Sequence, residues 1–548
     1  SGSLSMAVAN GAVDLGFSYI VSSGNESQLN SSDYISYMID DPYTELIIAF
    51  IEEFRNIRKL KEVALKAQKE NVPIIVLKVG QSDIAKEATQ AHTAAVAGSD
   101  QAYDAFFQKR GIIRVSDLDE MFQTAKVFSM AKNKLPEGGD LGVLTLSGGE
   151  VSLIGDVCKS MNLGFPDWSS RTYRKLEKSL PDFITPKNPL DAWGSGALEE
   201  TYPVCIDLAS KDPNVDVIVG SLNASGKLAD EQIDQFKVAA ESMVETSRKT
   251  DKPVVAVSNV SADFDEEIRN LLEDGGVPFL RGTEKGFSSI EDFIEYGEFR
   301  KSKKTYKSGK NNVKPDELEN LERRFYVPGS HLSEFKSKKL LDHYGINTTD
   351  EELVKNKDEG LAAAERIGYP VVMKLLSEDI LHKTEAGTVR LGVGDRSELA
   401  EVYDELIKRA EEYNSDARIE GMLIQEMVER KSYEVILGFS DDPDFGPLIT
   451  FGLGGIFVEL LKDVSFCLPP VSPESASEMI NETKGSKILQ GFRGEPAGDL
   501  NALIKAIVNI GELASDWEGK ISALDINPLL VLPEGEGIVA VDALIDFK

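Results

Sequence analysis

The sequence predicts an α/β protein of several domains, two with parallel sheets and a last one that is partly antiparallel. Short apolar runs alternate with amphipathic segments over the first part of the chain, which is typical of parallel sheets covered by helices. This pattern occurs twice, over residues 1–135 and again over residues 136–299. The remainder carries longer strands joined by a hairpin. With 548 residues, the chain is long enough for three or four domains.

Composition and charge exclude several classes of partner. Acidic residues exceed basic ones by 92 − 60 = 32, and 41% of the residues are hydrophobic, as in soluble globular proteins. So negative a surface disfavours nucleic acid and anionic membranes as partners. We see neither an apolar run of membrane-spanning length nor a secretory leader. The three cysteines are far apart in apolar surroundings, so we expect buried thiols and a cytoplasmic protein.

The first domain, residues 1–135, is expected to form a parallel sheet. Ligands bind such sheets at the carboxyl ends of their strands. The loop that holds His92 follows one of these strands and therefore lies on that side. Expected strands are Phe17–Val21, Leu46–Ile51, Pro73–Val79 and Ile113–Val115, and expected helices are Asn56–Lys69 and Ala102–Arg110.

The second domain, residues 136–299, opens with a strand that runs into a small-residue loop and a helix. The strand is Leu141–Leu146 and the loop is Ser147-Gly148-Gly149-Glu150. The first residues of the chain, Ser1-Gly2-Ser3-Leu4, have the same character, and we interpret the two as a diverged repeat. Because the chain opens inside such a unit, we expect it to be part of a longer protein. Further predicted strands are Val215–Gly220, Val254–Val257 and Pro278–Leu280, with a helix over Glu231–Arg248.

A lysine-rich stretch separates these domains from the last one. Residues 300–330 have little apolar content over Arg300–Arg324, so we predict a solvated linker. The last domain, residues 331–548, contains the strands Tyr433–Phe439 and Leu448–Phe451 around a Ser-Asp-Asp-Pro-Asp-Phe-Gly turn. Two strands around such a turn predict a hairpin and hence an antiparallel part.

His92 is the first candidate for chemistry. It is one of four histidines, and alanine, threonine and glycine residues surround it. Small side chains leave room and expose backbone N–H groups, and a free imidazole nitrogen is reactive near neutral pH. The alternative is an exposed histidine at a helix start with no role.

The last domain offers a phosphate and metal site. Lys374 ends a buried-looking strand and precedes a glycine-containing loop, which suits a grip on nucleotide phosphates. Three glycines in Phe451–Glu459 allow close backbone approach. Asn527 and Asp542 stand at the ends of two strands and carry the oxygen ligands that Mg²⁺ prefers. The alternative is a pair of ordinary strand-end turns.

Taken together, the motifs resemble the NDP-forming acyl-CoA synthetase superfamily, which includes ADP-forming acetyl-CoA synthetases and succinyl-CoA synthetases. The resemblance implies two flavodoxin-like CoA-ligase domains followed by an ATP-grasp domain. It also implies a CoA-binding domain, supplied in cis or in trans, to which nothing in this sequence corresponds. The matching stretches are Ser1–Leu4, His92–Asp104, Ile380–Gly387, Asp442–Pro447, Phe451–Gly455 and Asp525–Leu529.

The resemblance also implies a reaction, ATP + carboxylate + CoA ⇌ ADP + phosphate + acyl-CoA, through acyl phosphate and phosphohistidine intermediates. His92 is then the phosphorylated histidine, and Glu52, or its neighbour Glu53, orients it. His382 resembles a second phosphohistidine on a moving loop, and Asp525 the acid that steadies it. A neutral imidazole attacks, while its other nitrogen donates to the orienting carboxylate.

The remaining implied sites hold phosphate, nucleotide and metal. Two helix N-termini would stabilise the phosphoryl group, each equivalent to about half a positive charge. The residues expected to bind phosphate are Ser1, Gly2, Ser3, Ser147, Gly148 and Gly149. ATP or ADP would contact Lys374, Glu426, Met427, Val428 and Glu434, and Mg²⁺ would bind Asn527 and Asp542.

Two residues differ from the pattern of the family, and a third residue bears on the choice of substrate. Ala94 stands where relatives have glycine, and Glu150 is an odd neighbour for phosphate unless it faces away. Trp193 either lines a pocket for the carboxylic acid or packs into the core. We expect a homo-oligomer. Two rival functions stay open: an ATP-grasp carboxylate–amine ligase without a histidine relay, and a non-catalytic nucleotide-sensing module.

Overall fold

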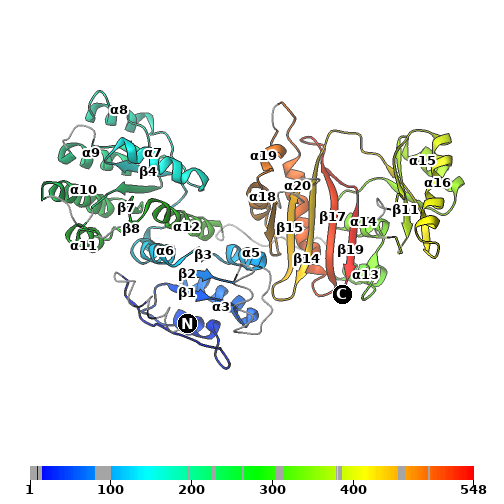
Figure 1. The fold of residues 1–548 in the computed structure, drawn as a ribbon, viewed down its shortest axis with the longest axis horizontal. Helices are drawn as coiled ribbons and strands as arrows, with labels where there is room; N and C mark the ends of the chain where they lie inside the picture. Colours follow the sequence, from blue (N-terminus) through cyan, green and yellow to red (C-terminus); the bar gives the residue numbers. More distant parts are fainter. Residues whose placement is uncertain are drawn as a thin grey trace. The chain divides into compact units, whose positions relative to one another are not determined.

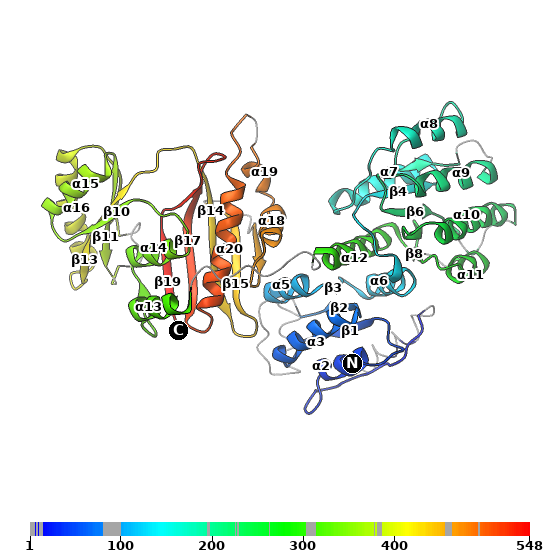
Figure 2. The same ribbon diagram turned by 180° about the vertical axis from the view of Figure 1, so that it is seen from behind.

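The computed structural model divides into two compact units (Figures 1 and 2). The first comprises residues 1–97 and 107–306, and the second residues 98–106 and 307–548. The four-part division expected from sequence stays a prediction. The structure describes residues 6, 9, 15–80, 100–193, 198–224, 226, 230–261, 264–302, 314–377, 379–380, 386–454, 463–491 and 494–548.

The first domain contains a three-stranded parallel sheet in the order β1-β2-β3. Its strands confirm three of the expected ones, and its fully buried central strand β2 fits a sheet covered on both faces. Helix α3 buries the stripe Leu60, Val63, Ala64 and Ala67. The elements are α2 (Ser31–Ile39), β1 (Ile47–Ile51), α3 (Ile57–Glu70), β2 (Ile74–Lys78), α5 (Asp100–Arg110), β3 (Ile112–Arg114) and α6 (Leu118–Ala131), followed by the 3₁₀ turn η1 (Lys132–Lys134).

The expected strand Phe17–Val21 is absent from this sheet. These residues are described but lie outside every strand. The side chains of Tyr19, Ile20 and Val21 remain 41%, 46% and 42% exposed. The apolar sequence was typical of a strand, but a strand forms only where a neighbour supplies hydrogen bonds. The prediction is wrong at this point.

The second domain contains a five-stranded parallel sheet in the order β5-β4-β6-β7-β8. Each expected strand and the long helix are present. The elements are β4 (Leu141–Thr145), α7 (Gly148–Val157), η2 (Cys158–Ser160), α8 (Ser170–Ser179), β5 (Leu190–Asp191), α9 (Leu198–Ser210), β6 (Val217–Ser221), α10 (Asp230–Lys249), β7 (Val254–Ser258), α11 (Glu266–Asp274), β8 (Phe279–Arg281) and α12 (Thr283–Ser302).

Helices α6 and α12 join the two parallel sheets of the first unit (Figure 1). The ring of Phe128 on α6 packs edge-on against Phe293 and Tyr296 on α12. The same core contains side chains of β2 and of β4, β6 and β7. The two domains therefore share one hydrophobic core.

The second unit contains two antiparallel sheets. The smaller has the order β10-β13-β11-β12, and the larger the order β16-β15-β14-β17-β19-β9, with β18 paired to β17. Strands β14 and β15 are the expected hairpin. The strands are β9 (His331–Leu332), β10 (Glu351–Val354), β11 (Val371–Ser377), β12 (Val389–Val393), β13 (Ile419–Glu426), β14 (Tyr433–Asp442), β15 (Gly446–Leu453), β16 (Val464–Cys467), β17 (Ile521–Val531), β18 (Ile538–Ala540) and β19 (Ala543–Phe547).

Helices cover one face of each of these sheets (Figure 2). Helix α20 carries much of the larger core through Leu503, Ile507 and Ile510, and the fully buried Trp517 follows it. The helices are α14 (Glu334–His343), α15 (Lys357–Ile367), α16 (Arg396–Tyr413), α18 (Pro473–Glu482), α19 (Ser486–Leu489) and α20 (Leu500–Asp516).

Part of the expected linker is a packed helix. Helix α13 (Pro315–Phe325) buries Leu321 and Phe325 in the core of the second unit, and Leu318 packs against that core. Spacings of three and four residues place these side chains on one helix face. The solvated-linker interpretation is wrong for this half. None of the helices within the described ranges combines the length and hydropathy of a membrane-spanning segment.

Polar contacts of Glu120 on α6 with residues of α12 help to hold these two helices together, and a substitution can test them. Its buried carboxylate accepts hydrogen bonds from Ser116 N at 3.1 Å and Ser288 Oγ at 2.7 Å, and Lys285 Nζ lies 3.2 Å away. Burial raises the pKa of Glu120, but the hydrogen bonds from Ser116 and Ser288 and the charge of Lys285 outweigh it, so the pKa is lowered. A carboxylate with a lowered pKa stabilises the fold above its unfolded pKa and loses that effect as the pH falls.

We expect Glu120→Gln to lower the free energy of unfolding at pH 7 by about 1–3 kcal/mol, because the ionised acceptor is lost. The difference from wild type should shrink as the pH falls below the ordinary glutamate value of 4.5. Urea unfolding at both pH values measures it. Glu62→Gln, at an exposed pair with Arg58, is the matched control and should change little. A Glu120→Gln protein as stable as wild type at pH 7 would contradict the assignment.

Candidate active site

The predicted phosphate loop of the second domain lies at the start of helix α7. Ser147 is the N-cap, and its Oγ accepts a hydrogen bond from Gly149 N at 3.1 Å. Ser147, Gly148 and Gly149 are exposed, so the first N–H groups of a ten-residue helix are accessible. A helix N-terminus carries partial positive charge and favours anions. The loop therefore has the geometry that the sequence predicts, and phosphate binding stays a prediction.

Several predicted residues fall outside the described ranges. These are Ser1, Gly2 and Ser3, the histidines His92 and His382, and Ala94.

Glu52 and Glu53, the two candidates for the carboxylate that orients His92, follow directly after β1. Glu52 is exposed, whereas Glu53 is half-buried and its Oε2 has no hydrogen-bond partner among the described residues. The choice between the two carboxylates as the partner of an imidazole stays open.

Glu150 points toward the ends of the second sheet. Its Oε1 accepts from Asn223 Nδ2 at 2.8 Å, and its Oε2 lies 3.4 Å from Leu146 N. Burial, and the nearby charge of Asp191, raise the pKa of this carboxyl, although hydrogen bonds from its neighbours oppose the shift. The electrostatic conflict noted in the sequence is thus reduced, because Glu150 is engaged inside its own domain.

Trp193 packs against the hydrophobic core of the second domain. It is half-buried, and its Nε1 has no hydrogen-bond partner in the described part of the chain. The ring packs as the core alternative expects, and a role in a pocket for the carboxylic acid stays a prediction.

In the second unit, Lys374 on β11 lies in a buried cluster of charges. Its Nζ is 2.6 Å from Glu334 Oε1, 3.3 Å from Val541 O and 3.6 Å from Asp542 Oδ2. Burial lowers the pKa of Lys374, but the negative charges of Glu334 and Asp542 outweigh it and raise the pKa. The ammonium group is therefore held charged next to Asp542.

The cluster continues through residues that sequence reasoning missed. Lys338 Nζ lies 3.0 Å from Glu334 Oε1 and 2.7 Å from Glu351 Oε2. Lys338, Glu334 and Glu351 have side chains at most 1% exposed. The sequence feature that could have revealed part of this cluster is the four-residue spacing of Glu334 and Lys338 on helix α14. Glu351 comes from β10, and no sequence pattern links it to them.

Asp525, Asn527 and Asp542 meet on the larger sheet. Asp525 and Asn527 lie within β17 and are exposed, two residues apart and hence on the same face. Asn527 N donates to Asp542 O at 3.2 Å. The expected strand end is wrong for Asn527, because β17 continues to Val531, and it is confirmed for Asp542, which lies in the short connection between β18 and β19.

This arrangement has the donor set of a magnesium–phosphate site. Asp525 is among the exposed residues of β17, but partial burial of its carboxyl group, and then the charge of Asp542, raise its pKa. Within the described ranges, no group of three or more His, Cys, Asp or Glu side chains is arranged to hold a metal. Asn527 and Asp542 supply two hard oxygen ligands, and Mg²⁺ takes its others from water and phosphate. The residues therefore fit a metal that binds together with a nucleotide.

The segment from Glu426 to Glu434 links the two sheets of the second unit. Glu426 ends β13, and Met427 and Val428 are half-buried just beyond it. Glu434 is exposed on β14, and its carbonyl accepts from Gly454 N at 2.8 Å. A side chain at Gly454 would come within 3.0 Å of the Glu434 backbone, so a glycine is needed there. A role in holding adenine stays a prediction.

Lys338→Met tests the buried charge cluster. Because the lysine compensates two buried carboxylates, its loss should lower the free energy of unfolding by about 3–5 kcal/mol. Lys339→Met on the same helix is the control, since Lys339 is 40% exposed and 3.8 Å from Asp342. The control should cost at most about 1 kcal/mol. Chemical denaturation measures both, and equal effects would show that the cluster does not stabilise the fold.

Two family models match the chain. The ATP-grasp domain matches residues 328–547, and the succinyl-CoA ligase like flavodoxin domain matches residues 1–128. These ranges correspond to the antiparallel unit around Lys374 and to the first parallel sheet.

Three relatives are similar over long stretches. A 4-hydroxybutyrate–CoA ligase [ADP-forming] of Nitrosopumilus maritimus is 34% identical over 540 residues, which are 97% of this chain and 75% of the relative. An acetate–CoA ligase [ADP-forming] I of Archaeoglobus fulgidus is 32% identical over 525 residues, 96% of this chain and 73% of the relative. The beta subunit of acetate–CoA ligase [ADP-forming] II of Pyrococcus furiosus is 43% identical over 217 residues, 40% of this chain and 92% of the relative. The chain belongs to the family of ADP-forming acid–CoA ligases.

Proposed function

We propose that the protein catalyses ATP + carboxylate + CoA ⇌ ADP + phosphate + acyl-CoA through an acyl phosphate and a phosphohistidine. The observation that carries the nucleotide half is the meeting of Lys374, Asn527 and Asp542. A charged lysine held 3.6 Å from an oxygen ligand of Mg²⁺ suits the phosphates of a bound nucleotide. ATP or ADP, Mg²⁺ and CoA are the cofactors and substrates of this reaction.

Residues of the second unit would carry the phosphoryl group to and from the nucleotide. Lys374 binds phosphate oxygens, and Asn527 and Asp542 hold Mg²⁺, which neutralises charge on the phosphates. Glu426, Met427, Val428 and Glu434 contact the nucleoside. Asp525 accepts a hydrogen bond from His382 while that histidine carries the phosphoryl group. Burial and the charge of Asp542 raise the pKa of Asp525, so a donor or a positive charge that reached it would be favoured.

Residues of the first unit would carry the acyl-side steps. The neutral imidazole of His92 attacks the phosphorus of the acyl phosphate, and the carboxylate leaves with the bonding electron pair. Glu52, or Glu53, accepts a hydrogen bond from the other ring nitrogen and fixes the tautomer. The N-terminus of α7 at Ser147, Gly148 and Gly149 stabilises the phosphoryl charge, together with the matching loop Ser1–Ser3.

CoA would be bound by a further part of the enzyme, in cis or in trans. The Nitrosopumilus maritimus and Archaeoglobus fulgidus relatives extend beyond the match by about a quarter of their length. The Pyrococcus furiosus relative is one subunit, the beta subunit, of a ligase built from separate chains. Assembly of this enzyme from several parts is therefore consistent with its family. Homo-oligomerisation stays a prediction.

Incubation with γ-labelled ATP and Mg²⁺ tests the histidine relay. We expect an acid-labile, base-stable phosphate on His92 and His382, because a phosphoramidate has that stability. His92→Ala should abolish overall ligase activity in the presence of the CoA-binding part and should remove the label from residue 92. His343→Ala, at the end of helix α14, is the control and should keep both. Full activity of His92→Ala would favour the amine-ligase rival, and nucleotide binding without labelling would favour the sensing module.

Asp542→Asn tests the metal–nucleotide site. Losing one carboxylate ligand should weaken Mg²⁺-dependent ADP binding by roughly tenfold, about 1.4 kcal/mol. Binding without Mg²⁺ should change much less. Asp546→Asn on strand β19, which begins just after Asp542, is the control and should leave both affinities unchanged. Isothermal titration calorimetry with and without Mg²⁺ measures the four affinities, and an Asp542 variant with normal Mg²⁺ dependence would remove Asp542 from the site.

A further inference from the structure

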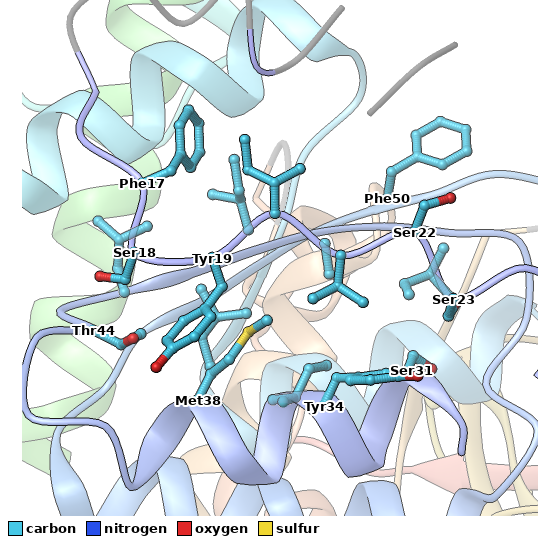
Figure 3. A pocket seen from close by; sticks show the side chains of 18 of the residues that line it. Phe17, Ser18, Tyr19, Ser22, Ser23, Ser31, Tyr34, Met38, Thr44 and Phe50 are labelled. Carbon is cyan, nitrogen blue, oxygen red and sulfur yellow. The ribbon is translucent and has the colours of Figure 1, made fainter. Parts of the chain in front are cut away.

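A groove of about 560 Å³ runs along the free side of the first sheet. The extended segment Leu15–Gly24 lines one wall and strand β1 the opposite wall, and helix α2 contributes Ser31, Tyr34 and Met38 (Figure 3). The exposed apolar side chains of Tyr19, Ile20 and Val21 belong to this groove. The groove thus has strand β1 in one wall, and its lining combines apolar side chains with polar ones such as Ser22, Ser23 and Thr44.

The edge of β1 in this groove is able to pair with another strand. On its other edge β1 pairs with β2, where Ile47 N donates to Pro73 O at 2.9 Å and Ile51 O accepts from Val79 N at 3.0 Å. In a parallel ladder alternate residues bond to the same neighbour, so the N–H and C=O groups of Ile48 and Phe50 point into the groove. No strand within the described residues pairs with them.

The second domain shows which strand lies at the position equivalent to the groove beside β1. There β4 lies between β5 and β6 and pairs in parallel with both, with Leu144 opposite Leu190 and Leu141 opposite Val217. The chain passes from β4 directly into the loop Ser147-Gly148-Gly149. The first domain repeats this loop in sequence, and its β1, β2 and β3 follow one another in space as β6, β7 and β8 do. The outer edge of β1 therefore corresponds to the edge of β6 that β4 occupies.

We propose that this groove binds one extended apolar strand, parallel to β1, supplied by the CoA-binding part of the enzyme. The inference rests on the proposed function, because it assigns the strand to the quarter of the relatives that lies outside the match. The strand would be about five residues long, to match β1, and nearly all apolar, since both of its faces would be covered. Strand β4, with all five residues buried, is the example within this chain.

The geometry favours this occupant over a second copy of the chain. A two-fold axis between two β1 edges would make their pairing antiparallel. It would also leave the wall formed by Leu15–Gly24 without a strand to cover it. A single parallel strand fills the groove and pairs with Ile48 and Phe50 at the same time.

The test grafts a copy of residues 140–146, which include β4, directly ahead of Ser1. We expect the graft to raise the melting temperature by roughly 4 °C or more and to slow amide exchange in residues 46–52 at least about tenfold. Hydrogen-exchange mass spectrometry and circular dichroism measure these changes. A graft carrying Leu144→Pro in the copied strand is the control, because proline cannot donate toward β1. The same peptide added in trans should give saturable protection of residues 46–52.

The outcomes separate the groove from the enzyme reaction. A graft and peptide that leave exchange and melting unchanged, or act no better than the proline control, would overturn the groove proposal while leaving histidine labelling intact. Protection with no labelled histidine would leave the groove proposal standing and count against the proposed reaction. Protection of residues 46–52 that rises with the concentration of the ungrafted chain would assign the groove to a second copy and overturn the proposal.

Discussion

A chain with a formal net charge of −32 has to hold phosphate groups, and this constraint shapes both units. The long-range field of the protein repels a nucleotide, so attraction must come from groups in direct contact. In the first unit the exposed start of α7, which we propose as a phosphate site, offers backbone N–H groups. In the second unit a buried lysine is paired with acids beside an asparagine and an aspartate. Both devices act at short range, where the net charge matters least.

The buried charge cluster also limits what Lys374 can do. Glu334 holds the lysine in place and keeps it protonated, and Lys338 in turn compensates Glu334 and Glu351. A phosphate that approaches Lys374 therefore competes with a carboxylate 2.6 Å away. Such an arrangement favours orientation over raw affinity, because the lysine gains little new charge compensation when it binds a ligand.

Sequence patterns predicted the elements whose signal is local. Fully buried strands such as β2, β4 and β7 are short apolar runs, and their burial on both faces explains why the runs were readable. Helix α13 was missed because charged residues dilute the apolar positions Leu318, Leu321 and Phe325. The segment Phe17–Val21 does not form the predicted strand, because a composition pattern carries no information about hydrogen-bonding partners.

The site residues could likewise be predicted only where their signal is local. Lys374, Asn527 and Asp542 stood out as single residues in suggestive places, and the fold brings them together. Glu351 escaped notice because it joins Lys338 only through contact between β10 and α14. Pairings between distant segments depend on topology, and residue patterns do not contain it.

The edge of β1 that pairs with no strand of the described residues also has a consequence for the handling of this protein. Exposed strand edges template edge-to-edge aggregation, and the apolar side chains beside this edge would strengthen such contacts. Mutual repulsion between highly acidic molecules opposes these encounters at low ionic strength. At about 1 M salt the Debye length falls to roughly 3 Å and that protection disappears. The excess of carboxylates thus protects the protein against aggregation, and buffers of low ionic strength preserve this protection.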